Sequence, residues 1–246
     1  MSWRAYGASV RGVSHDRTGL PCQDAHGWRL LPGGIACAVA DGLGSAPRAD
    51  AGARIAVAAA LDGLTAAPPE DVTAAQVALT QAFAAAREAL RAAAADAPLR
   101  DFATTLLLAV AVGDGVAVGQ IGDGAVVGCW PDGRLETLSL PQRGEYANET
   151  TPLTAHEALD SVRVTVWPRP IQALALFSDG LQALALNLAS GEPHAPFFAP
   201  FLAALAEPFD PDATGARLAD FLAAPRVCAR TDDDKTLLVA GLGPPG

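Results

Sequence analysis

Aspartate residues stand at the ends of three apolar segments that lie far apart in the sequence. Asp41 and Asp179 each directly follow an apolar run, and Asp233 stands shortly before another. Short apolar runs of this kind indicate buried strands, so rigid backbone delivers each carboxylate to the edge of a sheet. Because like charges repel, carboxylates from distant parts of a chain converge for few reasons, and a hard divalent cation is the commonest of them. The pattern therefore predicts a metalloenzyme.

The same aspartates also have a simpler explanation. Asp-Gly is a common turn dipeptide, and it occurs six times in this chain. For the copies that stand between hairpin strands, a plain turn is sufficient. Asp41 and Asp179 differ, because each follows a fully apolar strand and precedes a helix or a loop that enters one. Taken alone, Asp24 in its loop and the acidic run at 232–234 are typical of solvated segments, although the run directly precedes an apolar strand.

Composition narrows the class of protein. The chain has 246 residues, 50% of them hydrophobic, which is enough for one large core, and residues 1–246 are expected to form a single domain. The formal net charge of −10 argues against nucleic acid as a partner, because phosphate binding needs a basic patch. It argues more weakly against an anionic membrane surface.

Cysteine usage and the lack of targeting signals indicate the compartment. The 4 cysteines form no C-x-x-C pair, so neither a disulfide framework nor a zinc site is expected. The N-terminus lacks the apolar region of a signal peptide, and no apolar run is long enough to cross a membrane. These features predict a reduced, cytoplasmic protein without membrane contact.

Hydrophobic periodicity divides the chain into helical ends and a strand-rich middle. Residues 73–95 form the clearest helix, with Leu79, Phe83 and Leu90 recurring at helical spacing. Between 104 and 138, short apolar runs are separated by Asp-Gly turns, which is typical of an antiparallel meander and leaves no room for the helices of a doubly wound fold. An α+β fold in layers is therefore expected. The expected strands are 7–13, 26–31, 35–40, 104–112, 116–121, 125–130, 134–138, 162–166, 174–177 and 236–240, and the other expected helices are 50–64, 181–189, 197–205 and 212–223.

Six short motifs follow one another along the chain in an order that resembles a known family. Each motif is weak alone, but their order and spacing, from about residue 7 to residue 240, resemble those of the metal-dependent serine/threonine protein phosphatases of type 2C (the PPM family) in a bacterial form. The resemblance implies a four-layer α-β-β-α sandwich, with two central antiparallel sheets flanked by helices. The motifs are Gln23-Asp24, Ala40-Asp41-Gly42-Leu43-Gly44-Ser45, Ala103-Thr104-Thr105, Gly122-Asp123-Gly124, Ser178-Asp179-Gly180 and Asp233-Asp234-Lys235-Thr236.

The resemblance also implies a metal centre with two Mn²⁺ or Mg²⁺ ions. Asp41 is then the bridging carboxylate, and Asp123 helps to hold a third, weaker ion. Thr104 and Thr105 pack beneath the site rather than react. The implied ligands of the two main ions are Asp24, Asp41 and the backbone carbonyl of Gly42 for one or both of them, with Asp179 and Asp233 completing the second.

Ligands of this type determine the expected chemistry. Oxygen-only ligands select hard cations such as Mg²⁺ and Mn²⁺ rather than zinc. Two such ions share a bridging water and lower its pKa toward neutrality, so the resulting hydroxide attacks phosphorus directly and no phospho-enzyme forms. Asp24, Asp41, Asp179 and Asp233 are accordingly the expected catalytic residues.

Three places bear on how substrate is held. Family members usually carry an arginine before the first aspartate that holds the substrate phosphate; His15 stands there in this chain, so either His15 or the nearby Arg17 takes the role. A histidine would make phosphate binding depend on pH near about 6–7, and the alternative is an ordinary surface-loop histidine.

Leu43 replaces a histidine that some members use as general acid, so that acid is absent or is replaced by His15 or a metal-bound water. Segment 145–150 lies where a flap covers the site in the family, and it either selects substrate or is an ordinary loop.

These observations lead to three hypotheses of function. The leading hypothesis is an active, monomeric phosphatase for phosphoserine and phosphothreonine in proteins, with a bacterial Ser/Thr protein kinase or that kinase's target as substrate. The second is a regulatory binding module that keeps the fold with weak chemistry, and the intact aspartates argue against it. The third is a phosphoesterase for small molecules at the same site. Comparing activity on phosphopeptides with activity on nucleotide or sugar phosphates separates the third from the first.

Overall fold

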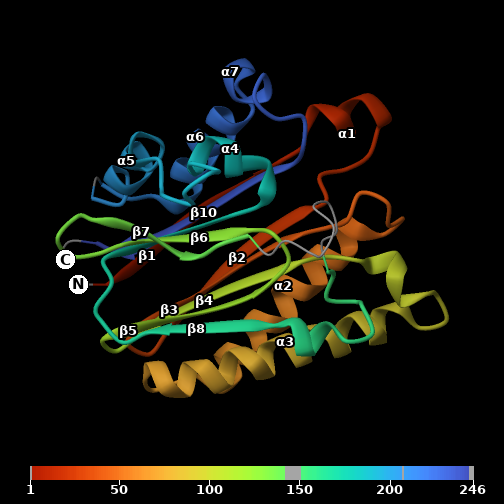
Figure 1. Ribbon diagram of the computed structural model, residues 1–246, viewed down its shortest axis with the longest axis horizontal. Coiled ribbons are helices and arrows are strands. Elements are labelled where there is room, and N and C mark those ends of the chain that lie inside the picture. Colours follow the sequence, from red (N-terminus) through yellow and green to blue (C-terminus); the bar gives the residue numbers. More distant parts are fainter. Residues whose placement is uncertain (1, 142–150, 207, 244–246) are drawn as a thin grey trace.

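Two antiparallel sheets stack face to face and carry helices on both outer surfaces (Figure 1). The computed structural model describes residues 2–141, 151–206 and 208–243. The first sheet is 5-stranded, in the order β1 (Trp3–Val10), β10 (Lys235–Leu242), β9 (Ala173–Phe177), β6 (Ala125–Cys129) and β7 (Leu135–Ser139). The second sheet is also 5-stranded, in the order β2 (Asp24–Leu31), β3 (Gly34–Asp41), β4 (Leu106–Val112), β5 (Gly115–Ile121) and β8 (Arg163–Trp167).

Helices cover the outer face of each sheet. The long helices α2 (Ala49–Ala66) and α3 (Val72–Ala94) pack on the second sheet, whereas α5 (Ala195–Ala203) and α6 (Pro211–Leu222) lie over the first. The order of layers is helix, sheet, sheet, helix, so the α-β-β-α sandwich expected from the sequence is confirmed. The shorter elements are α1 (Val13–Thr18), α4 (Gln182–Ala185), α7 (Pro225–Cys228) and the 3₁₀ turns Leu99–Phe102, Ala158–Ser161 and Asp179–Leu181.

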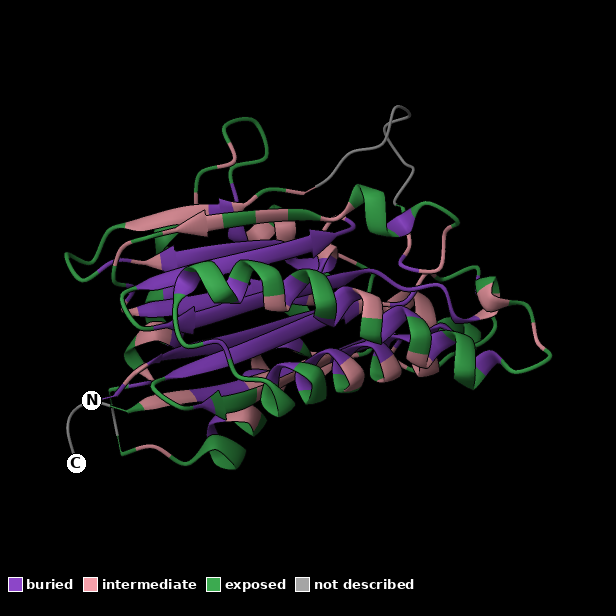
Figure 2. Cartoon of the chain, turned by 90° about the horizontal axis from the view of Figure 1, so that it is seen from below, coloured by how far each residue is buried: buried purple, intermediate pink, exposed green. Residues whose placement is uncertain are grey.

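Burial on both faces explains why the central strands are apolar throughout. Successive residues of a strand point to opposite faces of its sheet. Along β3, Ala36 and Ala38 belong to the core between the sheet and α2 and α3, whereas Ile35 and Cys37 belong to the core between the two sheets. Figure 2 shows the buried residues concentrated on the strands and the exposed residues on the outward faces of the helices. A fully apolar strand in this sequence therefore marks the middle of the sandwich.

The predicted meander between 104 and 138 is wrong at its centre. β4 pairs with β5 in the second sheet and β6 pairs with β7 in the first, so the chain passes from one sheet to the other at residues 122–124. Gly122 makes this passage possible, because its φ of 106° is a conformation that other residues rarely adopt and an added Cβ would lie 2.5 Å from the Thr105 side chain. Local periodicity does not reveal which sheet a strand joins, since the central strands of both sheets are apolar on both faces.

Two helix predictions also differ from the structure. The helix expected over 181–189 is limited to α4, because Leu186 forms a β-bridge with Pro193 and the Asn187 side chain accepts hydrogen bonds from the backbone N–H groups of Ala189 and Ser190. Conversely, α1 covers residues that were expected to be strand or loop. None of its residues is buried, so it has no apolar stripe that periodicity could detect.

The first and last strands of the described chain lie side by side. β1 pairs with β10 along its whole length, from Trp3 opposite Leu242 to Val10 opposite Lys235. The pairing places the loop that precedes β10 next to the loop that follows β1. Among the described residues, no helix is both long and apolar enough to cross a membrane.

The contact between α3 and β5 gives a test of the packing. An added Cβ at Gly119 would lie 2.6 Å from Cε2 of Phe83, which is fully buried. We expect Gly119→Ala to lower the free energy of unfolding by about 1–3 kcal/mol in urea denaturation, because the core is overpacked. Adding Phe83→Leu should recover part of that loss. Gly63→Ala is the control, since its Cβ would meet only Ala85 at 4.0 Å and a helical Gly→Ala change is stabilising; equal destabilisation by both Gly→Ala changes would contradict this packing argument.

Candidate metal centre

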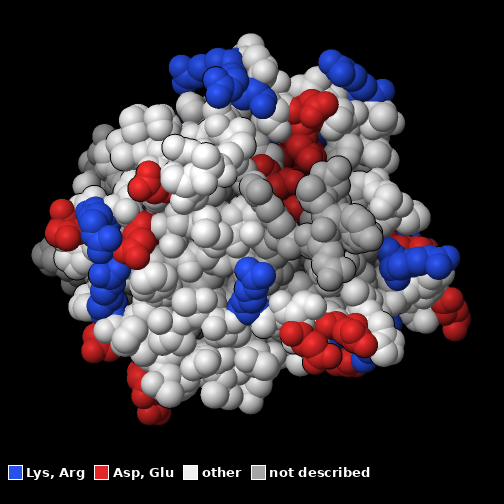
Figure 3. Space-filling view, in the orientation of Figure 1, with Lys and Arg blue, Asp and Glu red and all other residues white. Residues whose placement is uncertain are grey.

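A cavity of about 210 Å³ lies where β3 and β9 end and where the loop before β10 reaches that strand. Figure 3 shows acidic side chains gathered at this place, on the edge of the molecule between α1 and α7. Five aspartates from four separate segments contribute to its wall. The lining residues are His15, Gln23, Asp41, Gly42, Leu43, Gly44, Thr105, Asp123, Asp179, Asp233 and Asp234.

Three of these aspartates form a compact cluster. One carboxylate oxygen from each of Asp41, Asp123 and Asp179 lies within 4.8 Å of the others. Asp41 is the last residue of β3, Asp123 lies on the passage between the two sheets, and Asp179 begins the 3₁₀ turn after β9. Strand ends from both sheets thus bring together carboxylates that are far apart in the sequence.

The backbone of Asp41 is held on three sides by two threonines. Its N–H donates to Thr105 Oγ1 at 2.9 Å, and its carbonyl accepts from the Thr105 N–H at 2.8 Å and from Thr104 Oγ1 at 3.0 Å. Both threonines are buried. They fix the backbone that carries the Asp41 carboxylate, and Thr105 also lines the cavity, so their place beneath the site stays a prediction.

Asp24 lies behind this cluster. It stands opposite Asp41 in the pairing of β2 with β3, and its side chain is buried. Its Oδ2 accepts a hydrogen bond from Ser178 Oγ at 2.7 Å, and the N–H of Thr236 donates to the same Ser178 oxygen at 3.0 Å. Asp24 neither lines the cavity nor joins the compact cluster, so the structure places it as a neighbour of Asp41, and its role as a ligand stays a prediction.

The last two aspartates have different surroundings. Asp233 lines the cavity, and its Oδ1 accepts from the N–H of Asp234 at 2.8 Å. Asp234 also lines the cavity, and its carboxylate accepts hydrogen bonds from the N–H groups of Gly12 and Gln23, each at 2.6 Å, and from His15 Nδ1 at 3.0 Å. It therefore ties the N-terminal loop to the loop before β10. The sequence did not predict this function, because Asp234 stands in an acidic run and in the last of the six motifs without a role of its own.

Of the two residues expected to hold phosphate, the structure brings one to the cavity. His15 is largely buried and lines the cavity, and because its Nδ1 donates to Asp234, its Nε2 is left on the side of Gly44. Arg17 is exposed on α1 and does not line the cavity. Gln23 is a further cavity residue that the sequence reasoning did not assign a role, and its buried Oε1 has no hydrogen-bond partner among the described residues.

Burial and mutual repulsion perturb the aspartates of the site. Burial raises the pKa of Asp24 to about 7 and that of Asp179 to about 6. It also raises the pKa of Asp41, which the charges of Asp24 and Asp179 raise further. The pKa of Asp233 is raised as well, mainly by burial. At neutral pH these groups compete for few protons, so the site favours any cation that neutralises them.

The donor set fits hard divalent cations. All of the side chains in the compact cluster offer carboxylate oxygen, and the buried oxygens Asp24 Oδ1 and Asp179 Oδ1 have no hydrogen-bond partner among the described residues. An unpartnered buried carboxylate oxygen is costly unless a cation or a donor satisfies it. Oxygen ligands of this kind suit Mg²⁺ and Mn²⁺. The expected flap residues 145–150 lie outside the described part of the chain.

Comparison with known sequences decides the family. A sequence profile described as protein phosphatase 2C matches residues 11–223. The chain belongs to the protein phosphatase 2C family. It is 37% identical over 255 residues to serine/threonine-protein phosphatase 3 of Escherichia coli (strain K12), a match that covers 98% of each chain. The family suggested by the six motifs, and the enzyme class of protein-serine/threonine phosphatase, are thereby confirmed.

Solved structures of bacterial phosphatases share the fold. The serine/threonine phosphatase PstP/Ppp of Mycobacterium tuberculosis superposes with a TM-score of 0.69 at 20% identity, covering 99% of this chain and 100% of that one. The S. agalactiae serine/threonine phosphatase superposes with a TM-score of 0.70 at 13% identity, covering 98% of this chain and 99% of that one. The catalytic domain of PstP in complex with 2 manganese ions gives 0.64 at 21% identity, covering 98% and 99%. These likenesses show the shared fold, and the last of these structures contains 2 manganese ions.

The raised pKa values predict how metal and pH affect stability. A carboxyl group whose pKa is raised on folding stabilises the fold at acidic pH, and this contribution is lost as the pH rises through the folded-state values of about 6 and 7. In chelator, we expect the wild type to lose thermal stability between about pH 5 and pH 8, and Asp41→Asn, with one charge fewer, to lose less. Mn²⁺ at 100 times its Kd should raise the wild-type Tm at about pH 8 by about 5–10 °C and that of Asp41→Asn much less. An equal Mn²⁺ shift in both proteins, measured by scanning calorimetry, would show that Asp41 is not a ligand.

Proposed function

We propose that this protein is a Mn²⁺- or Mg²⁺-dependent phosphatase that removes phosphate from phosphoserine and phosphothreonine in proteins by direct attack of water. The observation that carries the proposal is the compact cluster of Asp41, Asp123 and Asp179, with Asp233 in the same cavity. Family membership and the relatives' names support the protein substrate. Because a protein kinase must create such a substrate, the phosphatase is proposed to oppose a bacterial Ser/Thr kinase, acting on the kinase itself or on its target.

The aspartates have separate proposed tasks in holding the cations. Asp41, Asp24 and the Gly42 carbonyl would hold one ion, and Asp41, Asp179 and Asp233 would hold the other. Asp123 is proposed to help hold a third ion. When bound, such ions supply a water molecule of lowered pKa and offset charge on the transferring phosphoryl group. The threonines beneath Asp41 and the hydroxyl of Ser178 keep these carboxylates in place.

His15 is the proposed holder of the substrate phosphate. The Asp234 carboxylate accepts a hydrogen bond from His15 Nδ1, which fixes the ring and keeps Nε2 on the cavity side. The Nε2 atom, when protonated, can donate a charge-assisted hydrogen bond to a phosphate oxygen. Gln23, with its side-chain amide in the same wall, is placed to orient a polar group of the substrate.

A covalent thiol route has no support in the described residues. No cysteine lines the cavity. Cys22 directly precedes the cavity residue Gln23, and burial and the charges of Asp24 and Asp234 raise the pKa of its thiol to about 12. Since the thiolate is the nucleophilic form, this thiol is inert at neutral pH.

The deciding experiment is hydrolysis of p-nitrophenyl phosphate and of a phosphothreonine peptide, with Mn²⁺, with Mg²⁺ and with chelator. We expect metal-dependent release of phosphate from both substrates. Asp179→Asn should lower kcat by orders of magnitude and keep the fold, because the change removes a ligand oxygen and not core packing. Folded wild-type protein that releases no phosphate with either metal would overturn the proposal in favour of a regulatory binding module, and a fully active Asp179→Asn variant would remove Asp179 from the site.

A second pair of variants tests phosphate binding. We expect His15→Ala to lower kcat/KM for the phosphopeptide by about 10- to 100-fold, mostly through KM, because a hydrogen bond to a charged group is lost. Arg17→Ala is the matched control and should change kcat/KM less than about twofold, since Arg17 is exposed away from the cavity. The Mn²⁺ concentration for half-maximal activity should change little in either variant; a loss confined to Arg17→Ala would reverse the assignment.

A further inference from the structure

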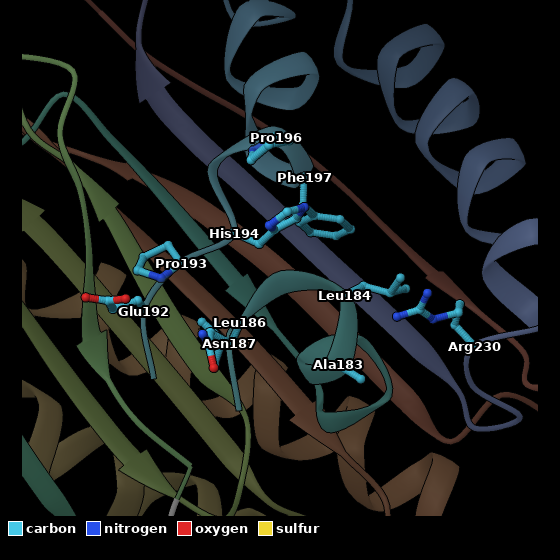
Figure 4. Close-up of a pocket in the computed structure, with 10 residues that line it drawn as sticks. All are labelled: Ala183, Leu184, Leu186, Asn187, Glu192, Pro193, His194, Pro196, Phe197 and Arg230. Carbon is cyan, nitrogen blue, oxygen red and sulfur yellow. The ribbon is translucent and has the colours of Figure 1, made fainter. Parts of the chain in front are cut away.

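A second, larger cavity lies between α4 and the start of α5. Its volume is about 650 Å³, and its walls come from α4, from the loop that leads into α5, and from Arg230 (Figure 4). Figure 4 shows Leu184 and Phe197 in the middle of the labelled residues, with Arg230 at one end and Glu192 at the other. We call this cavity the α4 groove.

The α4 groove is built from the chain segments that also carry metal-centre aspartates. α4 follows the 3₁₀ turn that begins at Asp179, and Arg230 stands three residues before Asp233. Gln182, the first residue of α4, donates from Nε2 to the carbonyl of Asp123 at 2.7 Å. Two short stretches of backbone therefore link residues of the groove to Asp179 and Asp233, which places the groove near the cavity of the metal centre.

The chemistry of the groove is apolar with one basic end. Leu184 is half-buried, and the ring of Phe197 is 9% exposed and packs edge-on against Phe198 and Phe201. Arg230 is exposed, forms no ion pair with any described side chain, and its side chain is directed toward Leu184 (Figure 4). At the other end, Glu192 accepts a hydrogen bond from the Ser190 hydroxyl at 3.1 Å. The end of the groove at Arg230 thus attracts an anionic group.

We propose that the α4 groove binds the segment of a phosphoprotein substrate that flanks the phosphorylated residue, with an apolar side chain over Leu184 and Phe197 and an acidic side chain at Arg230. This inference rests on the proposed phosphatase function. A second copy of the chain fits the groove less well, because each copy carries a formal net charge of −10 and two copies repel. For the same reason an acidic substrate needs a local cation to approach this protein, and Arg230 supplies one.

The test compares two kinds of substrate in the holoenzyme with Mn²⁺. The first kind is a set of phosphothreonine peptides that contain leucine and either glutamate or lysine, with these residues placed at each position beside the phosphothreonine in turn. The second is p-nitrophenyl phosphate, which has no peptide chain that could reach the groove. Arg230→Ala should lower kcat/KM about two- to fivefold for the best glutamate peptide and leave p-nitrophenyl phosphate within about twofold of wild type. Arg230→Glu should invert the preference, so that the lysine peptide becomes the better substrate. Ala183→Glu, which adds a negative charge to an exposed position of the same wall, should also weaken the glutamate peptide.

Arg163→Glu is the matched control, because Arg163 is exposed on β8 at the edge of the other sheet and the charge change is the same. It should leave both substrates unaffected. Glutamate and lysine peptides of equal kcat/KM in wild type and in Arg230→Glu would overturn the groove while leaving the phosphatase intact. An equal loss on peptide and on p-nitrophenyl phosphate would also overturn it, since damage to the metal centre would then explain the result. Wild-type protein inactive on both substrates would instead refute the proposed function.

Discussion

Repulsion among buried carboxylates is the constraint on which the rest of this structure depends. Asp24, Asp41, Asp179 and Asp233 are all placed where burial raises their pKa, and each of the first three also feels the charge of another. A flexible chain would relax by moving such groups apart. Here two stacked sheets prevent it, because the carboxylates stand at or next to strand ends that the sandwich core holds rigidly. The cost of this arrangement is what gives the site its affinity for a divalent cation.

Much of the fold follows from the sequence, because both faces of the central strands are buried. Runs such as β3 and β4 are apolar throughout, so their existence and approximate bounds can be predicted without structural information. The same property hides which sheet a strand joins, so the pattern around Gly122 predicts one more hairpin where the chain passes to the other sheet. Helix α1 is not predicted from the sequence, for the opposite reason. It buries no residue, so its position is set by contacts such as the bond from Ser14 N–H to the Asp232 carbonyl, which lies far away in the sequence.

Some residues of the candidate site can be predicted from the sequence and others cannot. Asp41 and Asp179 are visible from pattern alone, since an aspartate directly after an apolar strand is unusual, whereas Asp123 is one Asp-Gly turn among several and was found only through resemblance to a family. Asp234 and Gln23 were not assigned at all. The function of Asp234 consists of three hydrogen bonds to residues more than 200 positions away, and no local pattern encodes such contacts. Residues that touch a ligand leave a composition signal, but residues that hold others in place often do not.

The pairing of β1 with β10 has a consequence for how the molecule is assembled. Contacts such as Gly12 to Asp234 join residues that are 222 positions apart, so the first sheet and the loops beside it form only after almost all of the described chain is available. Such non-local pairing is slow to form, because loop-closure entropy is lost before any contact compensates for it. A growing chain can fold α2, α3 and the second sheet earlier, but Asp233 joins the cavity only when the segment before β10 is in place. The proposed metal centre is therefore complete only when folding is nearly finished.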